Sequence, residues 1–496
     1  MATEHKILLI EPPFCRLYEG SQSLCLYPLS LGYLAGTIRK ETDWDVTVYN
    51  ADFSPESKPY EVSYMTGIGF QNYLKNLRDL SGPVWEEVRS TIAESRPTVI
   101  GISSKSQNFR SSCIIAKLAK EIDSNILVIV GGPHSSMAGK DVLRDPNIDV
   151  SVRGEGERTL VELLAAIKQG RDFSGINGIL YRHGAEIIEN PPRQYIEDLD
   201  SLCFPHQYAP DVLKDFDQYP KSAFRAIFAT RGCPYNCFFC GSKNIWSRRV
   251  RYRSATSVSD EIKSLQRMGL GHIHFADDTF GVNKEHIHRI CNSLIQNCPG
   301  LKWGCEIHAN LVDERLIALM KKAGCVAVNV GIESGNNQML KKIRKTITVE
   351  KAISAANVIH DQGLDVSAFF MVGFPEETEE TLSDTMKAMG KINGHLIYSI
   401  FTPYPGTEAF QFCEEKGLID GDFDVSLYNH QSPENCFCVN LTKQRFRTIV
   451  SKMEIFVDRR NKNCALKEML SMQKIAGYIK DHGMVHSIRK FVSNVR

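Results

Sequence analysis

Hydrophobic and polar positions follow two alternating patterns along residues 6–168. Short runs rich in β-branched residues predict strands, and longer stretches with apolar residues three and four positions apart predict helices. The predicted strands are Lys6–Ile10, Asp45–Tyr49, Thr98–Ile102, Ile126–Val130 and Ile148–Val152. The predicted helices are Leu29–Lys40, Val84–Ser95, Ser111–Ile122 and Arg158–Lys168. This order predicts a doubly wound, Rossmann-like α/β domain with a parallel sheet covered on both faces.

The alternation stops near residue 176 and resumes near residue 226. Ile179–Tyr181 and Glu186–Ile188 predict a hairpin, and prolines follow it at positions 191, 192, 205, 210 and 220. We interpret this stretch as a connector between two domains.

A second alternation then predicts six strand–helix units. The strands are Ala226–Thr230, His272–Ala276, Lys302–His308, Val326–Gly331, Val366–Val372 and His395–Thr402. The helices between them include Val258–Met268, Lys284–Gln296, Glu314–Lys322, Val349–His360 and Glu379–Met389. Six such units predict a partial (β/α)6 barrel whose active site lies at the carboxyl ends of its strands. We therefore expect four segments: a Rossmann-like domain at 1–175, a connector at 176–222, a barrel at 223–413 and a mostly helical region at 414–496.

Glycine and small polar residues follow the predicted strands of the first domain. A ligand of a doubly wound sheet binds at the carboxyl ends of its strands, and glycine allows the backbone to approach it closely. Turns alone would also explain many of these glycines. The candidate residues are Ser103, Ser104, Gly131, Gly132, Pro133, Glu155 and Gly156.

Three cysteines follow the first barrel strand, in the run Arg231-Gly-Cys-Pro-Tyr-Asn-Cys-Phe-Phe-Cys-Gly241. Cys233, Cys237 and Cys240 can ligate one soft metal centre, and a [4Fe–4S] cluster held by three thiolates keeps one iron open for a ligand. A structural zinc site needs a fourth ligand. The nearest candidates, Cys203 and His206, lie upstream without matching spacing.

Acidic residues stand at two other predicted strand ends of the barrel. Asp277 and Asp278 are suited to binding a cationic amine, and capping of the next helix is the alternative. Glu333, in the run Gly331-Ile-Glu-Ser-Gly335, is suited to contacting a ligand, and a solvated turn is its alternative. The lone His134 we interpret as a turn or hydrogen-bonding residue, and the isolated Cys436-x-Cys438 pair as structural thiols.

Composition narrows the class of protein. The chain has 496 residues, 43% of them hydrophobic, and a formal net charge of +1, which argues against wholesale nucleic-acid binding. We expect no bilayer-spanning segment, because no apolar run approaches the necessary length. Fifteen cysteines and a first segment without a secretory pattern predict a cytoplasmic protein with free thiols.

These motifs together resemble the radical S-adenosylmethionine (SAM) superfamily. The resemblance rests on the three cysteines with Phe239 before the last, on Gly331–Gly335 and on Gly373-Phe-Pro-Glu-Glu-Thr378. Tyr27–Ala35, Gly131–His134 and Gly154–Glu157 resemble its cobalamin-binding branch.

The resemblance implies a [4Fe–4S] cluster, SAM and cobalamin as cofactors. It makes Cys233, Cys237 and Cys240 the cluster ligands, and it places Phe239 beside SAM. Asp277 or Asp278 would recognise the SAM amino group, and Glu333 the ribose or methionyl part. No Asp-x-His-x-x-Gly run occurs in the chain, so we expect a cobalamin without a histidine on its cobalt.

The function that the resemblance implies is cobalamin-dependent radical SAM methylation, and the alternative is an oxidative radical reaction. In the first, a 5′-deoxyadenosyl radical removes hydrogen from a substrate carbon, which then takes a methyl group from methylcobalamin. In the second, a cyclisation, ring contraction or other rearrangement occurs without methyl transfer. We expect a small-molecule substrate, such as a natural-product or lipid intermediate, and an electron donor such as flavodoxin or ferredoxin. No residue is assigned as the acid, base or radical relay of the reaction.

Overall fold

The structure is a computed structural model that describes residues 5–20, 22–59, 65–170 and 172–470. These residues form two compact units. The first contains the chain up to Trp303 together with Thr402–Ser432, and the second contains Gly304–Phe401 and the described residues from Pro433 onward. The units cut across the four linear segments expected from the sequence, whose borders stay a prediction.

A seven-stranded sheet with the order β3-β1-β5-β6-β7-β8-β9 is the centre of the first unit. Its strands are β1 (Lys6–Glu11), β3 (Asp45–Asn50), β5 (Val99–Ser103), β6 (Leu127–Gly131), β7 (Val150–Val152), β8 (Ile179–His183) and β9 (Glu186–Glu189). The first five strands along the chain pair in parallel, which confirms the predicted Rossmann-like sheet. Their residues are buried almost without interruption, because helices cover both faces.

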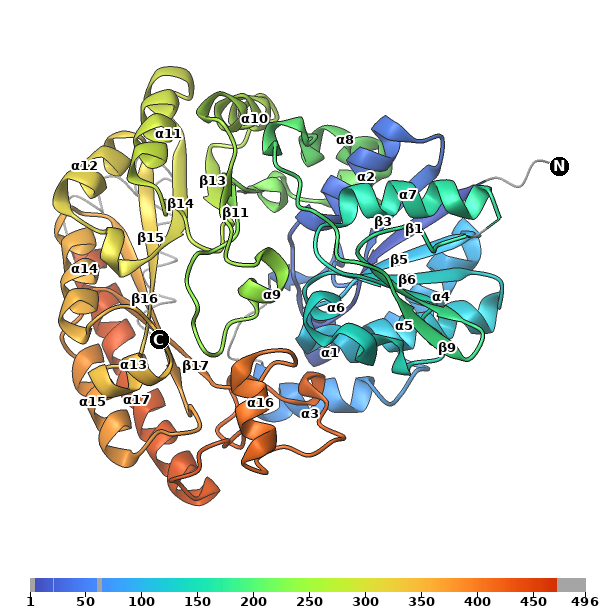
Figure 1. The fold of residues 1–496 in the computed structure, drawn as a ribbon. Coiled ribbons are helices and arrows are strands. Elements are labelled where there is room, and N and C mark those ends of the chain that lie inside the picture. Colours follow the sequence, from blue (N-terminus) through green and yellow to red (C-terminus); the bar gives the residue numbers. More distant parts are fainter. Residues whose placement is uncertain (1–4, 21, 60–64, 171, 471–496) are drawn as a thin grey trace. The chain divides into compact units, whose positions relative to one another are not determined.

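Helices lie on both sides of this sheet (Figure 1), with α2 and α7 on one side and α4 and α5 on the other. The helices of this part of the chain are α1 (Cys15–Tyr18), α2 (Leu29–Glu41), α3 (Gly67–Asn76), α4 (Pro83–Ser95), α5 (Phe109–Ile122), α6 (Pro133–Ala138), α7 (Gly156–Lys168) and α8 (Pro205–Val212). The fully buried Trp85 of α4 and Ile115 of α5 pack in the same core as Val128 of β6. Each such side chain contributes about 1.5–3 kcal/mol on burial.

The hairpin that we assigned to the connector belongs to the first sheet. β8 pairs antiparallel with β7, and β9 pairs antiparallel with β8. The two strands therefore extend the edge of the parallel sheet. Short local pairing predicts a hairpin from sequence, but its partner in the sheet depends on long-range packing.

A six-stranded sheet has the order β10-β13-β14-β15-β16-β17, and the boundary between the units falls within β14. The strands are β10 (Ala226–Ile227), β13 (His272–Phe275), β14 (Lys302–Ile307), β15 (Cys325–Glu333), β16 (Asp365–Val372) and β17 (His395–Ile400). The helices are α9 (Ser242–Trp246), α10 (Ala255–Arg267), α11 (Lys284–Asn297), α12 (Glu314–Lys322), α13 (Asn337–Lys342), α14 (Val349–Asp361), α15 (Glu379–Met389), α16 (Glu408–Glu415) and α17 (Lys443–Leu470). The predicted alternation of strands and helices is confirmed.

The first predicted barrel strand is shorter than expected. Only Ala226–Ile227 joins the large sheet, while β11 (Thr230–Arg231) pairs antiparallel with β12 (Arg251–Tyr252). The side chain of Asp277 accepts hydrogen bonds from the backbone N–H groups of Ala229 and Thr230, which removes these donors from the sheet. The remaining small sheet pairs β2 (Gln22–Ser23) with β4 (Lys58–Pro59).

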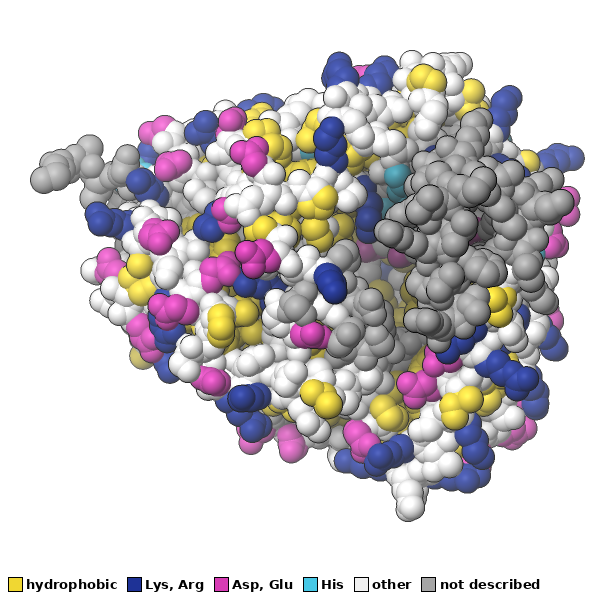
Figure 2. All heavy atoms as spheres, turned by 180° about the vertical axis from the view of Figure 1, so that it is seen from behind, with side chains coloured by type: hydrophobic (Ala, Val, Ile, Leu, Met, Phe, Trp, Pro, Cys, Tyr) yellow, Lys and Arg dark blue, Asp and Glu magenta, His cyan; other side chains and the backbone are white. Residues whose placement is uncertain are grey.

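The surface carries charges of both signs. On the face that Figure 2 shows, lysine and arginine side chains are interspersed with aspartate and glutamate side chains. Among the described residues, no helix combines the length and the hydrophobicity that crossing a membrane requires.

Candidate functional site: a cavity at the sheet edge and the cysteine loop

A cavity of about 540 Å³ lies within the first unit, at the carboxyl ends of its parallel strands. The five parallel strands follow the order 2-1-3-4-5 in chain numbering, so the order reverses between β1 and β5. Ligands of doubly wound sheets bind at this switch point. Glu11 and Ser103, the last residues of β1 and β5, both line the cavity.

Most of the residues predicted to bind cobalamin line this cavity. They are Ser103, Gly131, Gly132, Pro133, Glu155 and Gly156. Ser104 instead is fully buried: its N–H donates to the carbonyl of Gly131 at 2.8 Å, and its hydroxyl accepts from that of Ser112 at 3.0 Å. Ser104 thus fixes the glycine loop from behind.

The cavity wall lacks side chains where β6 ends. Gly132 has a φ of +93°, and a Cβ there would lie 2.8 Å from the carbonyl oxygen of Ser104. Gly131 has room, since a Cβ would lie 3.7 Å from the Cβ of Val152. A bare backbone wall beside a largely apolar cavity fits a flat macrocycle such as a corrin. None of the described residues that line the cavity is a histidine.

Lys105 is a cavity residue that sequence reasoning missed. Its Nζ lies 2.9 Å from Oε1 of Glu11, so the two charges meet at the switch point. The proximity of Glu11 raises the pKa of Lys105, which keeps the ammonium charged. Lys105 lies in the run Ser103-Ser-Lys-Ser106, directly after a predicted strand, but nothing in the sequence indicated that it pairs with Glu11.

The three cysteines occupy the loop that connects β11 to β12. All three are half-buried, and none is in a disulfide. Burial, helped by the nearby Cys237, Asp278 and Cys233, raises the pKa of Cys240 to about 12, although the N–H of Ser242 lowers it. Three soft donors within electrostatic reach on one loop fit an iron–sulfur cluster. In the described part of the chain, no three cysteine, histidine or acidic side chains already converge as metal ligands.

The neighbouring acids Asp277 and Asp278 have different environments. Asp277 is buried beneath β11 and accepts hydrogen bonds from two backbone N–H groups and from the hydroxyl of Thr230. Burial raises the pKa of Asp277 to about 6 in spite of these bonds. Asp278 lines the cavity, and its Oδ2 accepts from the Ser242 hydroxyl at 2.7 Å. Only Asp278 is placed to meet a ligand in the cavity.

Phe239 lies half-buried in the cysteine loop. It is not among the described residues that line the cavity. The aromatic residue of this region that does reach the wall is Trp246 of α9, which the sequence analysis did not select.

Glu333 belongs to the second unit, at the end of β15. Its backbone has a φ of +69° beside an irregularity in the pairing with β16, a conformation that costs a side-chain-bearing residue about 1–3 kcal/mol. The carboxylate lies 2.9 Å from Nζ of Lys345, and both side chains are largely buried. A Cβ on Gly331 would lie 2.8 Å from Oε1 of Glu333, so a side chain there would displace the carboxylate.

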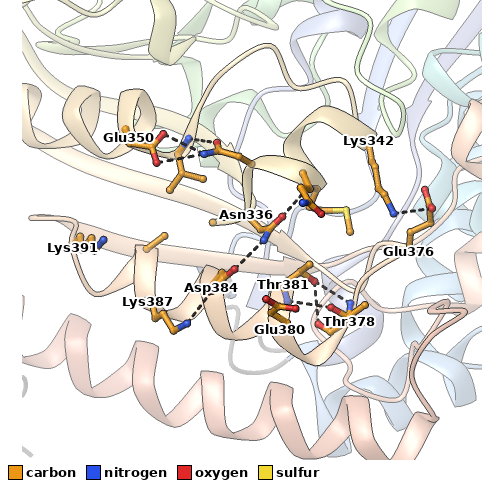
Figure 3. A pocket seen from close by; sticks show the side chains of 16 residues that line it. Asn336, Lys342, Glu350, Glu376, Thr378, Glu380, Thr381, Asp384, Lys387 and Lys391 are labelled. Atoms are coloured by element: carbon orange, nitrogen blue, oxygen red, sulfur yellow. Dashed lines mark hydrogen bonds and ion pairs between the residues drawn. The ribbon is translucent and has the colours of Figure 1, made fainter.

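A second cavity, of about 560 Å³, lies in the second unit between α13, α14 and α15 (Figure 3). Four of its charged side chains form two ion pairs: Lys342 with Glu376 at 2.9 Å, and Asp384 with Lys387 at 2.9 Å. None of the residues predicted for the site lines it. We assign this cavity no role.

Two family models match the chain. The radical SAM superfamily model matches residues 227–389, and the B12 binding domain model matches residues 20–164. The fold and the site thus define a radical SAM enzyme that carries a B12-binding domain.

Similar proteins refine this class. An uncharacterized methyltransferase of Pyrococcus horikoshii is 31% identical over 84% of this chain and 84% of its own length. The anaerobic magnesium-protoporphyrin IX monomethyl ester cyclase of Rubrivivax gelatinosus is 31% identical over 70% of this chain, which spans 63% of that enzyme. The structure of the radical SAM methyltransferase TsrM from Kitasatospora setae, with cobalamin and a [4Fe–4S] cluster bound, covers 84% of this chain and 76% of its own at 19% identity and a TM-score of 0.64.

The chain belongs to the cobalamin-dependent radical SAM methyltransferase family. It is an enzyme whose cofactors are a [4Fe–4S] cluster, SAM and cobalamin.

Proposed function

We propose that the enzyme methylates a carbon atom of a small molecule, with the methyl group coming from cobalamin. One observation carries this proposal: the residues expected to bind cobalamin and residues of the cysteine loop line the same cavity. Gly131 and Gly132 form its corrin-type wall, while Asp278 and Gly232, the neighbour of Cys233, line it from the cysteine loop. Such proximity is what an enzyme needs to bring a short-lived radical to its methyl donor before solvent intervenes.

The chain's own residues divide the binding work. Cys233, Cys237 and Cys240 would hold the cluster, and Asp278 would bind the amino group of SAM. When bound, the cluster supplies the electron that cleaves SAM, and cobalamin supplies the methyl group. Phe239 and Glu333 remain candidates for further contacts to SAM. Lys345 neutralises Glu333, so this carboxylate would act as a hydrogen-bond acceptor within an ion pair.

The surroundings of the enzyme are part of the proposal. We infer an electron donor of the flavodoxin or ferredoxin class, because reductive cleavage of SAM consumes one electron. None of the fifteen cysteines, all of which are described, forms a disulfide, which suits a reducing cytoplasm. The substrate class is a natural-product or lipid intermediate.

The test needs no knowledge of the substrate. Anaerobically reconstituted enzyme receives hydroxocobalamin, a strong reductant and SAM labelled at its methyl group. We expect S-adenosylhomocysteine to form and the label to appear on the corrinoid. Cys436→Ala should behave as wild type, whereas Cys237→Ala should lose the cluster absorption and the 5′-deoxyadenosine. Formation of 5′-deoxyadenosine with no S-adenosylhomocysteine and no labelled corrinoid would favour the oxidative reaction of the cyclase relative.

A further inference from the structure

The loop that carries the cysteines is closed at its base by a short antiparallel pair. Thr230 pairs with Tyr252, and Arg231 pairs with Arg251. The two arginines, one at each end of the loop, are therefore neighbours. Cys233 follows Arg231 after a single glycine.

Both arginines bind acids from the loop that begins α7. Nη1 of Arg231 lies 2.7 Å from Oε1 of Glu155, and its Nη2 lies 2.6 Å from Oε1 of Glu157. Nη1 of Arg251 lies 2.8 Å from Oε2 of Glu155. The two guanidinium groups thus pair with the two carboxylates. The planar guanidinium of Arg231 binds both acids at once.

This cluster of four charges is buried, with no side chain more than 9% exposed. Burial alone would raise the pKa of Glu157, but Arg231 holds it below its ordinary value. The guanidinium of Arg231 lies 5.2 Å from the centre of the Tyr33 ring. A buried ion pair of this kind contributes little net stability but is costly to break, so it fixes geometry.

Three of the four charged residues line the cavity. Glu155, Glu157 and Arg231 line it together with Gly232. Gly232 has a φ of +106°, and a Cβ there would lie 2.0 Å from the carbonyl oxygen of Arg249. The link between Arg231 and Cys233 is therefore packed closely against the backbone of Arg249.

We propose that Arg231, held by Glu155 and Glu157, is a positioning residue. It couples the loop that carries Cys233, Cys237 and Cys240 to the loop that begins α7, at the proposed cobalamin site. Binding of the [4Fe–4S] cluster then orders the cavity wall against which the corrin binds, and binding of the corrin orders the cysteine loop. The proposal rests on the cofactors of the proposed function but not on methyl transfer itself. Coupling of two sites is reciprocal and measurable as a ratio of affinities.

The experiment compares hydroxocobalamin affinity of full-length protein with and without its cluster, by anaerobic titration of visible absorbance. We expect wild-type protein to bind about fivefold or more tightly when the cluster is present, the lower end of ordinary coupling. In Arg231→Lys, where one ammonium cannot bridge two carboxylates, the ratio should fall towards one. Glu157→Gln should act in the same direction.

The matched control is Arg253→Lys. Arg253 forms another buried ion pair, with Glu261, and neither residue lines the cavity. This variant should lose stability yet keep the wild-type affinity ratio, which separates coupling from mere destabilisation. Should Glu157→Gln fail to fold, Arg231→Lys decides, because it keeps a cation beside both acids.

Three outcomes would overturn the coupling: an unchanged ratio in Arg231→Lys, an equal loss in Arg253→Lys, or a wild-type ratio of one. Wild-type protein that binds no corrinoid would overturn it together with the proposed function. Coupling without label transfer to the corrinoid would contradict only the methylation. Label transfer with an unchanged ratio in Arg231→Lys would contradict only the coupling.

Discussion

At the residue scale, Asp277 and Asp278 show how neighbouring identical side chains acquire different roles. They follow β13, and Asp277 is buried beneath β11 while Asp278 faces the cavity. The sequence predicted an acid for SAM at this strand end but gave no means of choosing between the two. Which of the two acids faces the cavity depends on the break between β10 and β11. There, backbone N–H groups donate hydrogen bonds to Asp277.

Replacing each acid by its amide tests this difference. Asp278→Asn should weaken SAM binding by about tenfold or more, since a hydrogen bond to a charged group contributes about 1.5–3 kcal/mol. The cluster absorption should not change. Asp277→Asn should instead lower the melting temperature, because three donors lose part of their acceptor. Equilibrium binding of SAM to reconstituted protein measures the first effect, and equal losses of affinity in both variants would contradict the assignment.

Glu377 is a buried acid whose charge the fold disfavours. It is fully buried; Oε2 accepts from the N–H of Phe374 at 3.2 Å, and Oε1 has no hydrogen-bond partner among the described residues. Burial raises the pKa of Glu377 from 4.5 to about 8, although backbone N–H groups oppose the shift. The folded state therefore holds the proton more tightly than the unfolded state.

This tight proton predicts the pH dependence of stability. The contribution of Glu377 is fully present below pH 4.5 and is lost as the pH rises through about 8. The slope reaches about 1.4 kcal/mol per pH unit for one group. Glu377→Gln should flatten this slope in denaturant unfolding, while the half-exposed neighbour variant Glu376→Gln should keep it. An equal slope in wild type and Glu377→Gln would contradict the buried neutral acid.

At the scale of elements, the predicted strands and helices were confirmed wherever the hydrophobic period was long and regular. In β16, for example, Val366, Ala368, Phe370 and Val372 are buried and alternate with more exposed residues. Local pattern could not show that β8 and β9 extend the first sheet, or that the first barrel strand divides. Both depend on partners distant in sequence.

The glycine loop after β6 allows a prediction about cobalamin. Gly131→Val should lower hydroxocobalamin affinity by about tenfold or more, because the new side chain projects at the cavity wall, where its Cβ has room. Gly132→Ala should instead destabilise the protein, since its φ is +93° and its Cβ would meet Ser104. Gly175→Val makes the same change as Gly131→Val where nothing lies within 4 Å, away from the cavity. Wild-type affinity in Gly131→Val would contradict the corrin-type wall.

At the scale of the whole molecule, sequence reasoning found the class of enzyme, and most of the residues that it predicted to bind cobalamin line the cavity. It missed the pairing of Arg231 with Glu157, which lie 74 positions apart. Both residues stood in recognised motifs, but a motif shows which residues occur and not which of them meet. It also treated domains as continuous segments, whereas the first unit recruits Thr402–Ser432.

The returning segment has a consequence for how the protein is made. It contacts the loop that carries the cysteines: Asn244 donates to the carbonyl of Gly406 at 2.7 Å, and the N–H of Ala409 donates to Phe238. A ribosome that adds 5–20 residues per second needs roughly 6–26 s to translate from Trp303 to Ser432. During that interval the cysteine loop lacks its contacts with Gly406 and Ala409. We therefore expect the three thiols to be more accessible to iron–sulfur assembly factors and to oxidants on the growing chain than on the finished enzyme.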